Sequence, residues 1–277
     1  MPERHSLDTV AAALAEIMGI PAPKHANTAN PELLAFANQR FSGQKADRIV
    51  MYNPDAVAQW VCGKYPAFLK EVISRTQLKL PLESPMPSVT PVCFGTMYTG
   101  AQPEVHTLQL DGEKHVIPID TLFDALIRAG RKPVLLAYAG GSLSVIYNGR
   151  EMDYYMYKDF SELNAKAVQL ILEDQHDFYV IYNGGYDFRL HDHGPEAPQT
   201  LGELRINSHM FGLIHELIRA NWKHHRTLLG FAMDHGCHLN MENWDNDPHE
   251  IGTHGLDTPE DRHIMHYYTT IGGEDVQ

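Results

Sequence analysis

The chain has 277 residues and a mass of 31.3 kDa, with 43% hydrophobic and 21% charged residues, a balance that excludes a disordered or fibrous protein. The formal net charge is −13 and the basic residues form no runs, which argues against a nucleic-acid polymer as partner. No apolar stretch approaches the roughly 18 residues of a membrane span, the first residues lack a signal-peptide pattern, and the three cysteines suit a reducing compartment. We therefore expect a soluble, cytoplasmic protein with no membrane partner.

Short apolar runs alternate with amphipathic patterns along the chain, which is typical of an α/β fold. In chain order we expect a helix at Leu7–Met18, a helix at Pro31–Phe41, a strand at Arg48–Tyr52, a helix at Ala56–Arg75, a loop at Pro81–Pro91, a helix at Asp120–Ala129, strands at Pro133–Tyr138 and Leu143–Tyr147, a helix at Ser161–Glu173, a strand at Phe178–Tyr182, a helix at Leu204–Asn221, and strands at Thr227–Met233 and His263–Ile271. Most of the strand runs are apolar throughout, as in a sheet buried on both faces. The sequence predicts one domain over residues 1–277, with a mostly parallel central sheet, helices on both of its faces and a helical N-terminal extension at 1–45.

The histidine content is the one abnormal feature of the composition. Of 17 histidines, 13 fall between His176 and His266. Histidine is the commonest metal ligand, so this local excess indicates a metal site, although a hydrated surface with incidental imidazoles would account for it equally well.

Polar clusters stand at or just after the expected strand ends, where open α/β sheets bind their ligands. They are Asn53-Pro54-Asp55, Asp187 with His191, Asp234-His235-Gly236 and Gly252-Thr253-His254-Gly255. A spacing of four residues on a helical turn puts the Asp187 carboxylate and the His191 imidazole on one face, within reach of one cation. Each pair taken singly is also compatible with a turn or a helix cap, but their joint occurrence favours metal binding.

The segment from Thr90 to Gly100 is expected to be a helix. A threonine followed by Pro91 fits an N-cap with proline at the first helical position. The amides of that helix end would then form an anion site beside the Thr90 hydroxyl. An ordinary helix cap is the alternative interpretation.

Taken in this order, the segments resemble the alkaline phosphatase superfamily, and within it the type I phosphodiesterase/nucleotide pyrophosphatase branch. That pattern has an aspartate ending the first core strand, a threonine or serine nucleophile on a helix closing in Thr-Gly, then Asp-x-x-x-His-x-x-Gly-Pro, Asp-His-Gly and Gly-Thr-His-Gly. The matching positions here are Asp55, Thr90 with Thr99-Gly100, Asp187 to His191 with Gly194-Pro195, Asp234-His235-Gly236, and Gly252-Thr253-His254-Gly255. The resemblance spans about residues 46–272, and the short stretch at 196–226 leaves no room for a large cap domain.

The resemblance implies two divalent metal ions held by two groups of side chains. One group would be Asp187, His191 and His254, and the other Asp55, Asp234 and His235, with the Thr90 hydroxyl beside it. Imidazole and carboxylate ligands favour zinc, with manganese or iron as alternatives. Cys93 and His193 are expected to lie near the substrate.

The activity implied is hydrolysis of a small phosphate ester or nucleotide-like substrate, of the phosphodiesterase or nucleotide pyrophosphatase type, through a phospho-threonine at Thr90. A phosphomonoesterase or phosphonate hydrolase using the same site is the nearest alternative. A binding protein that holds metal without turnover is an alternative of another class. The chain departs from the branch at His106, which is followed by Thr107 where the pattern has glycine, and in having no arginine beside Thr90.

Overall fold

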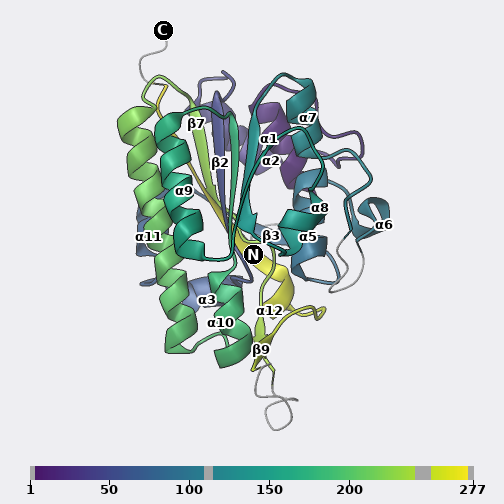
Figure 1. Cartoon of the computed structure of the whole chain (residues 1–277), viewed down its shortest axis with the longest axis vertical. Helices are drawn as coiled ribbons and strands as arrows, with labels where there is room; N and C mark the ends of the chain where they lie inside the picture. Colours follow the sequence, from purple (N-terminus) through teal and green to yellow (C-terminus); the bar gives the residue numbers. More distant parts are fainter. Residues whose placement is uncertain (1–3, 109–114, 241–250, 274–277) are drawn as a thin grey trace.

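The computed structural model describes residues 4–108, 115–240 and 251–273, and its centre is an eight-stranded sheet (Figure 1). The strand order is β1-β3-β10-β7-β2-β6-β4-β5. The strands are β1 (His5–Ser6), β2 (Arg48–Pro54), β3 (Leu78–Glu83), β4 (Pro133–Tyr138), β5 (Asp153–Tyr157), β6 (Phe178–Asn183), β7 (Thr227–Phe231) and β10 (His263–Ile271). Strand β10 runs antiparallel to its neighbours β3 and β7, and the other pairs are parallel, so the predicted mostly parallel sheet is confirmed.

Helices cover both faces of this sheet, as predicted (Figure 1). One face carries α1 (Thr9–Ile17), α5 (Thr90–Thr99), α7 (Leu122–Arg128) and α8 (Ser142–Ile146), and the other carries α4 (Lys70–Arg75), α9 (Phe160–Glu173) and α11 (Pro198–Asn221). The remaining elements are α2 (Pro31–Arg40), α3 (Gln59–Lys64), α6 (Pro103–His106), α10 (Gly185–His193), α12 (Pro259–Arg262), and a small antiparallel pair, β8 (His238–Leu239) with β9 (Gly252–Thr253). No separate cap domain occurs among the described residues.

The middle strands β2, β6 and β7 form the centre of the core. Every residue of β6 and β7, and all of β2 after Arg48, is buried, because helices cover both faces of these strands. This double burial explains why their sequences are continuous apolar runs that could be recognised as strands. The N-terminal segment joins the same core, since β1 pairs with β3 and residues such as Leu7 and Leu14 are fully buried.

One sequence-based assignment is wrong and one strand was missed. The run Leu143–Tyr147 is not a strand: residues 143–146 belong to helix α8 and Tyr147 is its C-cap, because a short apolar run fits a buried helical turn as well as a strand. The strand at this edge is β5, whose residues 154–157 are only partly buried and which therefore lacks the continuous apolar signal.

Two further segments are divided differently from the prediction. The expected helix Ala56–Arg75 consists of α3 and α4, because Pro66 disfavours helical backbone in the preceding residue, Tyr65, where α3 is capped. The predicted loop Pro81–Pro91 is partly strand, since β3 continues to Glu83.

None of the helices in the described ranges has the length and apolar character needed to cross a membrane. Cys62, Cys93 and Cys237 are buried free thiols.

A buried histidine supports the helix that carries Thr90. His106, at the end of α6, has no exposed surface, and its Nε2 lies 2.9 Å from the Thr96 hydroxyl of α5. Burial lowers the pKa of His106 to about 4. The imidazole is therefore neutral in the folded protein under conditions where an unfolded chain would already bind a proton.

The difference in His106 protonation between the folded and the unfolded chain predicts a measurable pH dependence of the free energy of unfolding. Between about pH 6.5 and 4 the unfolded chain takes up the proton and the folded chain does not, so stability rises with pH in this window, by at most about 1.4 kcal/mol per pH unit. Other buried histidines, such as His266 with a pKa lowered to about 4, act in the same direction. Replacing His106 by Gln, which keeps a polar partner for Thr96, should therefore reduce the dependence without abolishing it, as measured by urea unfolding at pH 5 and pH 7. An identical dependence in parent and variant would show that His106 does not contribute.

Candidate metal centre

An aspartate follows each of three adjacent parallel strands, at one edge of the sheet. β2 pairs with both β6 and β7, and Asp55, Asp187 and Asp234 come directly after these strands or in the first turn that follows. The chain reversals are tight at this edge. A Cβ on Gly236 would lie 2.1 Å from the Glu260 carbonyl oxygen, and the Ala56 amide, in a left-handed backbone conformation with φ of 59°, donates to Asp234 Oδ1 at 3.2 Å.

The first group of ligands is Asp187, His191 and His254. Asp187 and His191 face each other across one turn of α10, with 3.4 Å between Asp187 Oδ1 and His191 Nε2. His254 follows β9 and places its Nε2 3.5 Å from the same carboxylate oxygen. The three ligand atoms therefore converge on one point, although the residues come from two distant parts of the sequence.

The second group is Asp55, Asp234 and His235, all without exposed surface. His235 Nε2 lies 3.4 Å from Asp55 Oδ1 and 3.3 Å from Asp234 Oδ2. The two groups are neighbours, since the rings of His235 and His254 have centroids 4.2 Å apart. The Thr90 hydroxyl lies beside this group, 3.3 Å from His235 Nε2 and 3.4 Å from each Asp55 oxygen.

Backbone carbonyls orient two of the imidazoles. His191 Nδ1 lies 3.1 Å from the Gly252 oxygen and His235 Nδ1 lies 2.9 Å from the Gly236 oxygen. A carbonyl only accepts, so both rings donate from Nδ1, and in the neutral form of each ring Nε2 is the nitrogen available to a metal. Position 252 requires glycine, because a Cβ there would lie 2.6 Å from the Leu190 carbonyl oxygen. This is the arrangement that metal-binding histidines adopt in proteins.

The residues present fit a pair of divalent ions. Asp187 Oδ1 and Asp234 Oδ2 are buried without any hydrogen-bond partner, which is costly unless a cation faces them. Their 3.3–3.5 Å separations from the imidazole nitrogens exceed a good hydrogen bond. They match the spacing of two ligands on one tetrahedral zinc ion, about 3.4 Å for bonds of about 2.0–2.1 Å.

Burial and neighbouring negative charge raise the pKa values of Asp55 and Asp234. Burial, with a contribution from the charge of Asp187, raises the pKa of Asp55 to about 6. Burial and the proximity of Asp55 hold the pKa of Asp234 well above its usual range. In the described ranges no lysine or arginine forms an ion pair with Asp55, Asp187 or Asp234, so the cluster lacks positive charge other than its own imidazoles.

The two groups open into a cavity of about 350 Å³. Thr90, Asp55, Asp187, His191 and His254 line it, together with residues 138–142, Pro91, Tyr182, Phe188 and Thr253. Phe188 is 48% exposed and its ring centroid lies 5.1 Å from that of Tyr138. The site is thus a small, partly aromatic pocket with no lysine or arginine among these lining residues.

Solved structures with the same arrangement of elements act on phosphorus compounds, as their names state. Murine ectonucleotide pyrophosphatase/phosphodiesterase 5, an inactive threonine-to-alanine variant in complex with AMP, has a TM-score of 0.60 and 12% identity over 81% of this chain and 88% of its own. The human protein of that name has a TM-score of 0.57 and 11% identity over 81% and 88%. Phosphonoacetate hydrolase from Sinorhizobium meliloti 1021, in complex with phosphonoformate, has a TM-score of 0.52 and 15% identity over 69% of this chain and 57% of its own.

This chain has the alkaline phosphatase fold. The likeness confirms the fold expected from the sequence resemblance, without a large cap domain. No protein-family model and no curated protein sequence matches the chain.

The alkaline phosphatase fold brings together all seven residues that the sequence suggested as metal ligands or nucleophile. The capping interpretation of Thr90 is wrong: the N-cap of α5 is Val89, Thr90 is the first helical residue, and its side chain makes no capping hydrogen bond. Its hydroxyl faces Asp55 and His235 instead. Cys93, buried one turn further along α5, and His193, at the end of α10, are not among the residues that line the cavity.

Sequence reasoning missed Tyr182. Its hydroxyl donates a short hydrogen bond to Asp55 Oδ2, and its ring lines the cavity. The available signal was its position as the last apolar residue of the run Phe178–Tyr182, at the carboxyl end of a strand. An aromatic residue at the end of a buried strand is usually part of the core, so its type gave no indication of this contact.

The two ligand groups predict the metal content of the purified protein. After removal of loosely bound metal, we expect close to two divalent ions per chain by elemental analysis, since two groups of three ligands are present. His254→Ala and Asp234→Asn should each lower the affinity for one ion by at least about tenfold and reduce thermal stability of the loaded protein. His209→Ala, a change of an exposed histidine on α11, serves as the control. Unchanged metal content in both ligand variants would exclude this assignment.

The contact between Tyr182 and Asp55 predicts a second effect. Tyr182→Phe keeps the ring, which packs edge-on against Phe94 with centroids 5.6 Å apart, but leaves an Asp55 oxygen without its donor. We expect affinity for the ion in the second group to fall about 10–100-fold, measured by competition with a chelator. Tyr147→Phe is the matched control, because it also removes a buried hydroxyl, one that donates to the Phe94 oxygen at 2.6 Å away from the ligands. Equal losses in the two variants would mean that Tyr182 acts only through packing.

Proposed function

We propose that this protein hydrolyses phosphate esters, with diesters or nucleotide-like compounds as the preferred class, and that Thr90 is its nucleophile. The observation that carries the proposal is the position of the Thr90 hydroxyl, 3.3–3.4 Å from ligands of the second group in a cavity that also contains the first. The named activities of the structurally similar proteins support it, including that of a murine protein described as inactive after a threonine-to-alanine change.

Asp187, His191 and His254 would hold one ion, and Asp55, Asp234 and His235 the other. When bound, two such ions supply the positive charge that stabilises the alkoxide form of a hydroxyl and the oxygens of a phosphoryl group during displacement. The ligand chemistry favours zinc over magnesium or calcium, because half of the ligands are imidazoles.

The chain itself positions the nucleophile. Thr90 is the first residue of α5, so the positive end of the helix dipole lies beside the reacting oxygen and the phosphoryl oxygens near it. The bond from Thr90 Oγ1 to phosphorus forms as the bond to the leaving alcohol breaks, and the hydroxyl proton passes to solvent. Water then cleaves the phospho-threonine and restores the hydroxyl.

The electrostatics of the cavity favour a diester over a monoester. A diester carries one negative charge and a monoester two near neutrality. The described lining includes four acidic or phenolic groups, Asp55, Asp187, Tyr138 and Tyr182, and no lysine or arginine to pair with the second charge. A phosphonate is the second candidate substrate, because phosphonoacetate hydrolase is among the similar structures.

The nucleophile is tested with two substitutions of similar shape. Thr90→Ser keeps the hydroxyl and should retain measurable turnover of a chromogenic phosphodiester. Thr90→Val keeps the branched shape without the hydroxyl and should lose turnover by at least about 10³-fold, with the metal content unchanged. The parent should be assayed with a diester, a monoester and a phosphonate to rank the substrate classes. Near-parental turnover by folded, metal-loaded Thr90→Val would overturn the assignment, and no turnover of any of the three by the metal-loaded parent would favour a binding protein.

A further inference from the structure

A third group of ligand-type side chains lies at the opposite end of the sheet. Asp174 is the C-cap of α9, shortly before β6, and His224 and His225 lie in the loop between α11 and β7. Since β6 and β7 begin there, this group is at the amino ends of the strands, remote from the two groups at their carboxyl ends. We propose that Asp174, His224 and His225 form a separate site for a nitrogen-preferring divalent cation of the zinc type.

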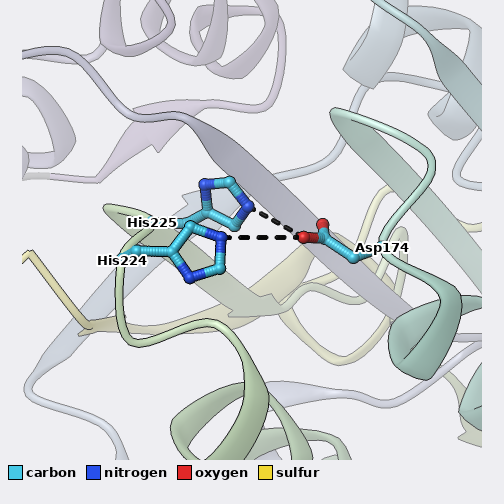
Figure 2. Close-up of side chains that lie close together, drawn as sticks. All are labelled: Asp174, His224 and His225. Atoms are coloured by element: carbon cyan, nitrogen blue, oxygen red, sulfur yellow. Dashed lines mark hydrogen bonds and ion pairs between the residues drawn. The ribbon is translucent and has the colours of Figure 1, made fainter.

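Both imidazoles converge on one carboxylate oxygen (Figure 2). His225 Nε2 lies 2.9 Å and His224 Nε2 4.0 Å from Asp174 Oδ2, and the two ring centroids are 4.0 Å apart. Two imidazole nitrogens and one carboxylate oxygen form a donor set used by zinc, whereas magnesium and calcium prefer oxygen ligands.

The surrounding structure holds two of these side chains in place. The His225 amide donates to the Trp222 oxygen at 2.9 Å, and Gly272 passes so close that a Cβ there would lie 2.2 Å from the His225 oxygen. Asp174 adopts a left-handed backbone conformation with φ of 49°, in which glycine is the usual C-cap residue, so a carboxylate is present where a helix end does not require one. Arg48 Nε binds the other oxygen, Oδ1, at 3.0 Å and leaves Oδ2 directed toward the imidazoles.

Neighbouring charges determine how tightly this site would bind a cation. Arg48 also binds Asp177 at 2.7 Å, and Arg131 lies 3.6 Å from Asp177, so two arginines already balance two carboxylates. The two groups at the carboxyl ends of the strands have no arginine that balances their carboxylates, and they should therefore hold their ions more tightly. His224 is 65% exposed, which leaves the remaining coordination position open to water. An ion here would link the end of α9 to the start of β7 and raise thermal stability without altering turnover.

Copper(II) provides a local test, because it prefers nitrogen ligands and quenches tryptophan emission at short range. The Trp222 ring centroid lies 6.2 Å from that of His225, and Trp222→Phe identifies the emission that belongs to it. The titration uses the full chain loaded with zinc and freed of loosely bound metal. His224→Ala is the key variant, since its side chain is 65% exposed and contacts only Asp174 and the His225 ring among the described residues, so its loss should not affect folding. His209→Ala, an exposed histidine on α11, is the matched control.

We expect copper to quench Trp222 emission in the parent and in His209→Ala, and His224→Ala to need at least about tenfold more copper for half-quenching. Added zinc should raise the melting temperature of the parent and the control more than that of His224→Ala. Superimposable quenching curves for parent and His224→Ala, or no quenching of Trp222 in the parent, would overturn the proposal. The hydrolytic rate should be the same in all three proteins, and a failure of the parent to hydrolyse any ester would leave these outcomes unaffected.

Discussion

The structure depends on three carboxylates at one edge of a sheet: Asp55 and Asp234 are fully buried, and Asp187 is partly exposed but has its Oδ1 oxygen buried. Removing such groups from water costs several kcal/mol each unless positive charge or donors replace the solvent. The described chain provides three imidazoles, one tyrosine hydroxyl and a few amides, but no lysine or arginine paired to these groups. The edge therefore has an excess of negative charge that added cations would balance.

The parallel arrangement of β7, β2 and β6 makes this concentration of charge possible. Their hydrogen bonds keep neighbouring strands in fixed register, and their covered faces exclude water from everything except the ends. Each strand then contributes one carboxylate at the point where the chain turns away. The backbone accepts local strain to do so at the left-handed Ala56, and the close packing at position 236 requires glycine.

The two ends of the sheet use the same side-chain types in different electrostatic settings. At the carboxyl end, aspartates and histidines meet without arginine and line a cavity together with a hydroxyl. At the amino end, Asp174 and its two histidines share their surroundings with Arg48 and open to solvent. By our two proposals, the same side-chain types would therefore form a centre for phosphoryl transfer in one place and a weaker stabilising site in the other.

The sequence by itself determined the elements and residues whose signal is local. Continuous apolar runs marked β2, β6 and β7 because both of their faces are buried, and the polar motifs after them indicated Asp55, Asp187, His191, Asp234 and His235. A separate motif before the last strand indicated His254, and the division into two groups came from the family resemblance. Only the tertiary structure decided what depends on distant neighbours. It made Leu143–Tyr147 part of a helix and the weakly patterned β5 the edge strand, turned the Thr90 hydroxyl from its own helix toward Asp55, and placed Tyr182 on the same carboxylate. It also joined Asp174 to His224 and His225, since their spacing along the chain carries no signal and the contact arises from how α9 and α11 pack beside the sheet.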